Sequence, residues 1–264
     1  MAEIHATAIV AAGAELDADV EVGPYAIIGP KVKIAGGCRI GAHSVVEGRT
    51  TLGRNNVVFH HVSIGAAPQD LKYHGENTEV VIGDHNTLRE FVTVHLGTAG
   101  GGGLTCMGDH NLVMNYSHIA HDSRVGSHNI VANGAQLAGH VIIEDYVVVG
   151  ALVGIHQHAR IGESAILGAG AMVSQDVPPF CNATGDRALL FGLNLVGLKR
   201  RGFSAELVSS IKKAYRIVFR SGLRLADAIA RARRELAPSP QIAHFLAFLE
   251  KSERGICRPR GRGE

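Results

Sequence analysis

The sequence predicts a mainly β protein, in which a parallel β-helix of hexapeptide repeats is followed by a small α-helical domain. Three observations support this fold class. Aliphatic residues recur every six positions from Ile4 to Val173. Two segments that interrupt the repeat hold residues unsuited to a core. After Pro178-Pro179 the hydrophobic period changes to that of helices.

The six-residue repeat falls into three blocks, Ile4–Ile64, Ile82–Val94 and Met107–Val173, in which all 26 positions hold Ile, Val, Leu or Met. Neither a helix nor a half-buried strand produces this period. Six residues suffice for one short strand and one turn, and the Gly that often follows the aliphatic residue suits the turn. Hexapeptide periods of this kind are typical of parallel β-helices.

The period by itself determines neither the number of sides nor the hand of the coil. The repeats resemble those of the left-handed β-helix of hexapeptide acyltransferases. That resemblance implies three hexapeptides per coil and a triangular prism with three flat sheets. Successive coils would then stack about 4.8 Å apart. We therefore expect a left-handed β-helix over residues 1–180.

Two excursions are expected to leave the prism, at about residues 66–80 and 96–106. In the first, the six-step positions would be Asp70 and Glu76, which cannot be core residues. The second contains four consecutive glycines, Gly100–Gly103. We interpret it as a flexible excursion, because neither the Lys-Ser/Thr nor the helix of a phosphate-binding loop follows.

The prism is expected to end near Pro178-Pro179, because proline cannot continue a strand ladder. Residues 181–202 would connect it to an α-helical domain over residues 203–255, which would cover the open end of the prism. Helices are expected from Ser204 to about Arg220, over Leu225–Leu236 and over Gln241–Lys251. Residues 256–264, rich in Arg, Pro and Gly, are expected to be a disordered basic tail.

Composition excludes several classes of protein. The 264 residues are 46% hydrophobic and only 19% charged, which suits a packed core rather than a disordered chain. The longest apolar stretch, Val147–Ile155, is far shorter than a membrane span. The four cysteines have no CxxC spacing, and the N-terminus shows no secretory signal. We expect a cytoplasmic protein without a disulfide framework or a cysteine-based zinc site.

Charge is distributed unevenly along the chain. Residues 1–198 hold 10 Lys and Arg against 18 Asp and Glu, whereas residues 199–264 hold 16 against six. A basic segment on an acidic body indicates an anionic ligand or an acidic partner near the C-terminal part.

Stacking arithmetic places several histidines together. With three hexapeptides per coil, His121, Gly139 and Gln157 occupy one slot of successive coils, about 5 Å apart. His140 and His156 flank this slot, and His118 lies three residues before His121, so these histidines gather at one edge. Other histidines, such as His43, His110 and His128, are expected to be ordinary surface residues.

Two chemistries suit this cluster. Imidazoles can hold a zinc ion and leave one position open for water. Alternatively, His121 can act as a base without a metal, since neutral histidine accepts a proton near pH 7. Asp122 would then orient the His121 ring, and the bare backbone N–H of Gly139 would suit an oxyanion.

Seven motifs carry a closer resemblance: His118–Asp122, Leu137–Val141, Ile155–Gln157, Gln69–Tyr73, Gly101–Thr105, Gln175–Pro179 and Gly197–Phe203. Together they are similar to the acyl-carrier-protein-dependent UDP-N-acetylglucosamine O-acyltransferases of lipid A biosynthesis. The likeness runs from about residue 4 to residue 254. The combination is specific, whereas hexapeptide repeats alone are shared by many acyltransferases.

This resemblance implies a homotrimer with active sites in the clefts between adjacent prisms. It implies transfer of an (R)-3-hydroxyacyl group from acyl carrier protein to the 3-hydroxyl of UDP-N-acetylglucosamine, the first step of lipid A biosynthesis. No cofactor, metal ion or nucleic acid is expected. The basic C-terminal helices would form a landing surface for the acidic carrier protein.

The resemblance also implies residue roles. His121 would be the general base, Asp122 would assist it, and the Gly139 N–H would stabilise the oxyanion. The residues expected to contact the sugar, the nucleotide or the acyl chain are Asp70, Lys72, His118, His140, His156, Gln157, Asn194, Arg200 and Arg201. Ala169 would limit the size of the acyl groove. Three positions depart from the family pattern, namely Leu96, Arg187 and Val196, and the preferred acyl length stays open.

Four alternatives remain at this point. One is a zinc hydratase of the gamma carbonic-anhydrase type, and another is a hexapeptide acyltransferase with a different sugar-nucleotide acceptor. A third is a covalent acyl-enzyme formed through Ser117 or Cys106. The last is a scaffold without catalytic activity.

Overall fold

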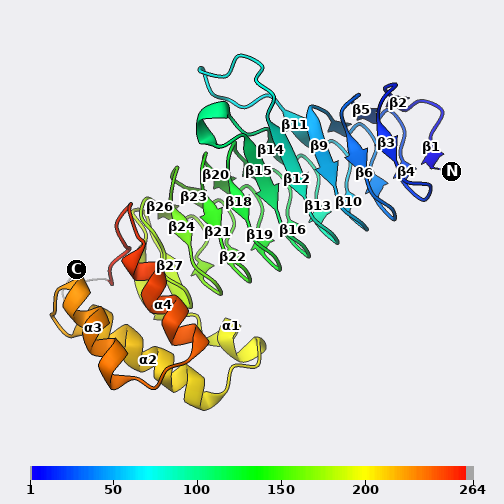
Figure 1. The fold of residues 1–264 in the computed structure, drawn as a ribbon. Coiled ribbons are helices and arrows are strands. Elements are labelled where there is room, and N and C mark those ends of the chain that lie inside the picture. The colour runs from blue at the N-terminus through cyan, green and yellow to red at the C-terminus, as the bar shows by residue number, and fades with distance from the viewer. Residues whose placement is uncertain (1, 260–264) are drawn as a thin grey trace.

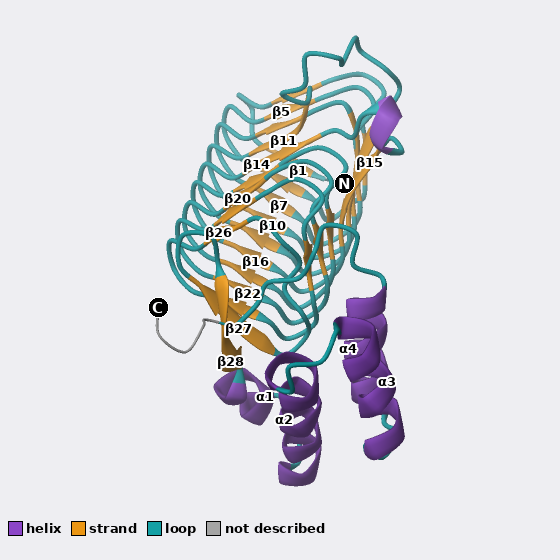
Figure 2. Ribbon diagram, turned by 90° about the vertical axis from the view of Figure 1, so that its left-hand side faces the viewer, coloured by secondary structure: helices purple, strands orange, loops and turns teal. Residues whose placement is uncertain are grey.

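Short parallel strands build a long prism, with helices packed against one end (Figure 1). This architecture is seen in a computed structural model of the chain, which describes residues 2–259. Figure 2 shows the strands of each face stacked in a column. The chain is a left-handed parallel β-helix followed by a small helical domain, as the sequence predicted.

Three sheets form the faces of the prism. The first contains β1 (Glu3–Ile4), β4 (Glu21–Val22), β7 (Arg39–Ile40), β10 (Val57–Val58), β13 (Thr87–Leu88), β16 (Leu112–Val113), β19 (Ile130–Val131), β22 (Val148–Val149), β25 (Ile166–Leu167), β27 (Cys181–Thr184) and β28 (Leu189–Leu193). The second contains β2 (Ile9–Val10), β5 (Ile27–Ile28), β8 (Val45–Val46), β11 (Ser63–Ala66), β14 (Thr93–His95), β17 (His118–Ile119), β20 (Gln136–Leu137), β23 (Gly154–Ile155) and β26 (Met172–Val173). The third contains β3 (Glu15–Leu16), β6 (Lys33–Ile34), β9 (Arg49–Leu52), β12 (Glu79–Ile82), β15 (Leu104–Met107), β18 (Arg124–Val125), β21 (Ile142–Ile143) and β24 (Arg160–Ile161).

The strand register confirms a coil of three hexapeptides. Gln136 pairs with His118 on one side and with Gly154 on the other, which are three repeats before it and three repeats after it. Coils lengthen only where an excursion leaves the prism, as between Thr93 and its partner His118. The repeat aliphatics point inward and are almost fully buried from Val22 onward. The first of them, Ile4, is 45% exposed because no coil covers that end.

Both excursions leave from the corner between the second and third sheets and lie on the same side of the prism (Figure 1). The first spans residues 67–78, between β11 and β12. The second spans residues 96–103 and contains the short 3-10 helix η1 (Ala99–Gly101). It does not project freely, because Thr98 donates hydrogen bonds to Asp122 in the adjacent coil.

Four helices follow the prism: α1 (Leu195–Arg200), α2 (Ala205–Arg220), α3 (Leu225–Glu235) and α4 (Pro240–Glu250). The bounds of the last three differ from the predicted ones by at most one residue. The Ser204 and Ser239 hydroxyls cap α2 and α4 by accepting backbone N–H groups. Within the described residues, each helix is too short or too polar to cross a bilayer.

The structure differs from the expected boundaries at the C-terminal end of the prism. Pro178-Pro179 occupies a corner, after which β27 pairs in parallel with β25 and continues the first sheet. The segment expected to be a connector instead forms a hairpin of β27 with the antiparallel β28, and then α1. At a corner no backbone N–H is needed for pairing with a neighbouring strand, so a proline there does not stop the coil.

The expected disordered tail is wrong for residues 256–259. Ile256 forms a bridge with Asp176, and Pro259 forms one with Leu190. The side chains of Ile256 and Cys257 are buried, which explains why this short apolar pair is held against the last coil. The rest of that expected tail, residues 260–264, lies outside the described residues.

Candidate active site

The candidate site is built on three successive turns at the corner between the second and third sheets. His121 and Asp122 lie between β17 and β18, and Gly139 and His140 lie one coil further, between β20 and β21. The next turn, between β23 and β24, carries residues 156–158. Asp122 and His140 adopt positive φ angles of 59° and 61°, which turn the chain sharply at this corner.

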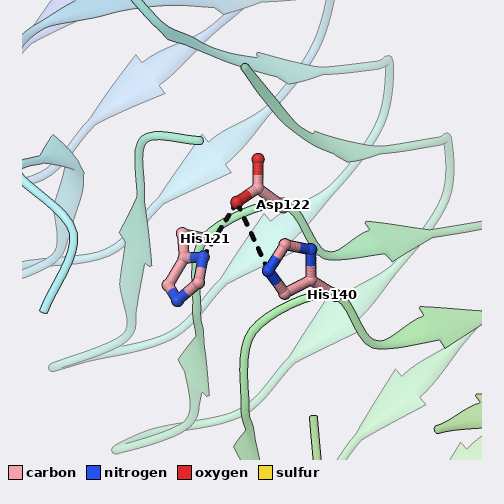
Figure 3. Close-up of side chains that lie close together, drawn as sticks. All are labelled: His121, Asp122 and His140. Atoms are coloured by element: carbon pink, nitrogen blue, oxygen red, sulfur yellow. Dashed lines mark hydrogen bonds and ion pairs between the residues drawn. The ribbon is translucent and has the colours of Figure 1, made fainter. Parts of the chain in front are cut away.

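His121 and Asp122 form the central pair (Figure 3). The distance from His121 Nδ1 to Asp122 Oδ2 is 2.8 Å. His140 Nε2 lies 3.9 Å from the same carboxylate oxygen, and the two imidazole rings meet edge to face. Because Nδ1 of His121 is engaged, its Nε2 is the nitrogen left to exchange a proton with a ligand.

The second excursion holds Asp122 in place. Asp122 Oδ2 accepts a hydrogen bond of 2.6 Å from the Thr98 hydroxyl, and Oδ1 accepts one of 3.0 Å from the Thr98 backbone N–H. The Asp122 N–H in turn donates to Thr105 Oγ1. Burial on its own raises the pKa of Asp122, but the hydrogen bonds from Thr98 and His121 outweigh it, so that this pKa lies below its ordinary value. The carboxylate therefore stays ionised at neutral pH.

Gly139 lies directly beside the His121 ring. A Cβ atom at this position would lie 2.5 Å from Cε1 and 2.6 Å from Nε2 of His121. Only glycine therefore allows the observed ring position. Among the described residues, the Gly139 backbone N–H has no hydrogen-bond acceptor.

A groove of about 540 Å³ runs along the second sheet in front of this pair. We call it the catalytic groove, and the residues that line it include Gln69, His95, His118, His121, Gln136, Ala138, Gly139, Gly154, His156, Met172 and Ser174. Side chains of several consecutive coils thus face one elongated hollow. The shape suits a long ligand that passes the His121 ring.

Two further imidazoles lie deep in this groove. His118 Nδ1 is 2.7 Å from the Thr93 hydroxyl, and burial lowers the pKa of His118 to about 4. The His95 ring meets His118 edge to face at 4.6 Å between centroids. Burial also lowers the pKa of His95, and its Nδ1 has no partner among the described residues. Both rings are therefore neutral at neutral pH.

Sequence reasoning missed His95. Val94 pairs with Ile119 in the next coil. His95 directly follows Val94, and Ala120 directly follows Ile119, so His95 occupies the position one coil before Ala120. The second excursion lengthens this coil, and the relation is therefore hidden from a step of three hexapeptides. Counting from one core position to the next across the excursion would have found it.

The structure brings only part of the expected set of residues together. Seven of these residues lie within the three stacked turns or on the adjoining strand β17, and they are His118, His121, Asp122, Gly139, His140, His156 and Gln157. Gln157 lies beside His156 and is exposed. Asp70 and Lys72 lie in the first excursion, where the Asp70 carboxylate accepts the Lys72 backbone N–H and the Lys72 side chain is exposed.

Four expected ligand-binding residues lie away from the groove of a single chain. Ala169 is exposed in the turn after β25, and Arg200 is exposed at the end of α1. Asn194 caps α1 by accepting the Gly197 N–H, and its amide donates to the Ser164 carbonyl. Arg201 forms an ion pair with Glu163 and lies over the Tyr146 ring, 3.7 Å from its centroid.

The histidines expected to be ordinary surface residues are not isolated. His43 stacks between Tyr25 and His61, with ring centroids 5.0 Å apart on each side. His110 and His128 belong to a second stack along another corner. Repeated positive-φ corners bring the rings of successive coils face to face, which composition alone does not reveal. Of the three departures from the family pattern, Leu96 is buried in the core, whereas Val196 and Arg187 are exposed.

The three residues of Figure 3 could also supply ligands to a metal ion. One ligand atom from each of His121, Asp122 and His140 lies within 4.8 Å of the others. However, His121 Nδ1 and Asp122 Oδ2 already satisfy each other, and Thr98 occupies much of the remaining capacity of the carboxylate. This arrangement resembles the orienting pair of a general base more than an open ligand set.

Comparison with known proteins gives a consistent result. The C-terminal residues 176–257 match the family model described as UDP N-acetylglucosamine O-acyltransferase, domain 2. The chain is 52% identical to an acyl-[acyl-carrier-protein]–UDP-N-acetylglucosamine O-acyltransferase of Thermodesulfovibrio yellowstonii, over 98% of this chain and all of the relative. It is also 52% identical to the enzyme of the same name from Myxococcus xanthus, with the same coverage.

Solved structures agree with these relatives. The fold superposes on LpxA from Acinetobacter baumannii with a TM-score of 0.94 at 44% identity, covering 97% of this chain and 99% of that one. The UDP-N-acetylglucosamine acyltransferase from Campylobacter jejuni gives a TM-score of 0.93 at 38% identity, covering 98% and 100%. Because the similarity extends over nearly the whole chain, including the groove and the C-terminal helices, the chain is a member of the acyl-[acyl-carrier-protein]–UDP-N-acetylglucosamine O-acyltransferase family.

Proposed function

We propose that the protein transfers an (R)-3-hydroxyacyl group from acyl carrier protein to the 3-hydroxyl of UDP-N-acetylglucosamine, the first step of lipid A biosynthesis. The observation that carries this proposal is the His121–Asp122 pair beside the bare Gly139 N–H in a chain with full-length relatives of that activity. The base and the oxyanion donor lie side by side, as a direct acyl transfer requires.

The reaction follows from this geometry. Nε2 of His121 takes the proton of the sugar hydroxyl while its oxygen attacks the thioester carbonyl carbon. The carbonyl oxygen becomes an oxyanion that accepts the Gly139 N–H. Collapse of the intermediate breaks the carbon–sulfur bond, and the imidazolium returns its proton to the departing thiolate of the carrier. Asp122, ionised at neutral pH, stabilises the imidazolium in between.

The other polar residues of the groove serve binding. The neutral rings of His95 and His118 suit hydrogen bonds to uncharged hydroxyl or amide groups of the sugar. His140, His156 and Gln157 extend the same row of polar side chains toward the end of the prism. Burial lowers the pKa of His140 below its ordinary value, although the charge of Asp122 and, more weakly, that of Asp70 oppose this shift.

A homotrimer would complete the site. Lys72, Ala169, Asn194, Arg200 and Arg201 lie outside the catalytic groove of one chain, although the family resemblance assigns them to ligand contacts. A second prism packed against the first would bring such residues to the groove. Large apolar side chains exposed along the prism support a covered face, and they include Tyr25, Phe91, Tyr116, Leu152 and Met172. Sedimentation velocity of the purified protein tests this: a monomer would refute it.

The helices suit an acidic carrier protein. Several cations of α2 and α3 carry no ion pair among the described residues, and they are Lys212, Lys213, Arg216, Arg220 and Arg234. Charge of this kind speeds the encounter with an acidic partner and is screened by salt. We place the enzyme in the cytoplasm, in keeping with four cysteines that are all free thiols.

Two rival mechanisms fit the structure poorly. The Ser117 hydroxyl is buried and donates to the Ala132 carbonyl, and burial raises the pKa of the Cys106 thiol. Neither side chain is therefore an activated nucleophile. A zinc hydratase would need a metal ion at His121, Asp122 and His140. Elemental analysis of active protein decides this point, since one tightly bound zinc per chain would favour the hydratase.

The decisive experiment is a panel of 3-hydroxyacyl carrier proteins of different chain lengths with UDP-N-acetylglucosamine, read by mass spectrometry. The expected product carries one ester-linked hydroxyacyl group. A parallel experiment with an amino analogue of the sugar shows whether the enzyme also accepts an amine at that position. If the sugar nucleotide remains unmodified with every donor, while calorimetry also detects no binding, the proposal fails.

A further inference from the structure

The C-terminal segment reaches back to the catalytic groove. After α4 the chain turns and runs along the last coil, where the Asp176 N–H donates to the Gly255 carbonyl and the Cys257 N–H donates to the Asp176 carbonyl. The Ser252 hydroxyl donates to the buried Asp176 carboxylate at 2.7 Å. This clamp on Asp176 fixes the backbone on both sides of Arg254.

Arg254 uses this anchorage to contact a residue of the groove. Its Nε donates to the Ser174 carbonyl at 3.1 Å, which orients the guanidinium. One of its terminal nitrogens lies 2.6 Å from Nδ1 of His156. His156 lines the groove on the turn after β23, two coils beyond His121. The two residues are 98 positions apart in the sequence, so only the fold brings them together.

The contact with Arg254 determines which nitrogen of the His156 ring carries the proton. Arginine has five N–H donors and no acceptor, so Nδ1 of His156 must offer its lone pair. A proton on Nδ1 would face an N–H of the guanidinium at 2.6 Å. The Gln157 carbonyl also lies near Nδ1, at 3.3 Å, and would favour the opposite tautomer. The contact with Arg254 is shorter and carries a charge, so it prevails.

We propose that Arg254 is a positioning residue that fixes the His156 ring with Nδ1 as the acceptor and the proton on Nε2. His156 then presents an N–H donor to the groove, and the ligand group it meets is an acceptor, such as a carbonyl, hydroxyl or phosphate oxygen. The helical domain thereby contributes to recognition in the groove through its C-terminal segment. The inference rests on the proposed function of the groove, but the ring state can be observed without turnover.

The first test reads the tautomer. Full-length protein labelled with ¹⁵N-histidine is studied by long-range ¹H–¹⁵N correlation, with His156 assigned by loss of its signals in His156→Gln. We expect Nε2 protonated and Nδ1 unprotonated in the wild type, and a mixture of tautomers in Arg254→Met. Protonation of Nδ1 in the wild type, or an unchanged tautomer in Arg254→Met, overturns the proposal whether or not the enzyme acylates the sugar.

The second test separates positioning from folding. Arg254→Met is expected to lower kcat/KM about 10- to 100-fold, the usual range for losing a hydrogen bond with a charged partner. Arg258→Met removes the same charge from an exposed position of the same segment and is expected to match the wild type. In a His156→Ala background, Arg254→Met should cost less than about twofold, because its effect passes through His156. An equal loss in both backgrounds refutes the proposal.

Discussion

The substitution Gly139→Ala tests the central geometry, because it adds one methyl group and keeps the backbone N–H. The new Cβ would lie 2.5 Å from Cε1 of His121, whereas ordinary van der Waals contact begins near 3.4 Å. The ring must therefore move by about 0.9 Å, the difference between these two distances. A displacement near 1 Å in a catalytic group costs about 100-fold in rate.

The cost to stability should be small. The atoms that the methyl meets belong to the end of a side chain, and the His121 side chain is 17% exposed, so it can turn aside without disturbing the core. Gly139 is not among the glycines with positive φ, so alanine introduces no backbone strain. We expect a change in the free energy of unfolding below about 1 kcal/mol.

The assay is the initial rate of acyl transfer to UDP-N-acetylglucosamine, with kcat and KM measured separately and melting followed by circular dichroism. We expect kcat to fall about 100-fold with little change in KM. Gly100→Ala is the matched control, because a Cβ there meets no atom within 4 Å. A folded Gly139→Ala variant with near-normal kcat would refute the placement of His121 beside the reacting atoms.

Three further predictions follow from the same contacts. His121→Ala should leave a folded protein with activity lower by about 100-fold or more; near-normal turnover would remove His121 from the mechanism. Thr98→Val removes one donor to Asp122, so the pKa of the Asp122 carboxyl should rise toward its ordinary value and kcat should fall about 10-fold; an unchanged titration of this carboxyl, followed by ¹³C NMR, contradicts this. The hydrogen bond with Glu144 raises the pKa of His244, so this pair stabilises the folded state while His244 is protonated. The contribution to the free energy of unfolding, below about 1 kcal/mol, should be present below pH ~6.5 and lost as pH rises through the raised pKa. Denaturant titrations of the wild type and of His244→Gln across this range should differ only at the acid end.

Local signals were sufficient for most of the fold. The six-residue period alone indicated which residues face the core, and the repeat positions from Val22 to Val173 are buried as it predicts. The cap at Ser204 is a side chain three residues from the N–H that it accepts, so the start of α2 was predictable too. The prolines were misleading, because the sequence cannot tell a corner from the end of a coil.

The site was predictable only where the period is unbroken. His121, Gly139 and His156 follow from a step of three hexapeptides, because every coil between them has that length. His95 and Thr98 lie across an excursion, and its path decides which residue it brings to Asp122. The contact of Arg254 with His156 was even less predictable, because it depends on how the helices return the chain to the last coil.

By itself, the sequence determined which residues face the core, because a repeat converts spacing along the chain into spacing in space. Together with three hexapeptides per coil, which the family resemblance implied, the same spacing predicted the row of imidazoles. Only the tertiary structure decided which groups hold the side chains of the site in place. Thr98 of the second excursion holds Asp122, and Arg254 of the C-terminal segment holds His156. Such contacts join segments with no common period, and they form because buried carboxylates and ring nitrogens require partners wherever the fold can supply them.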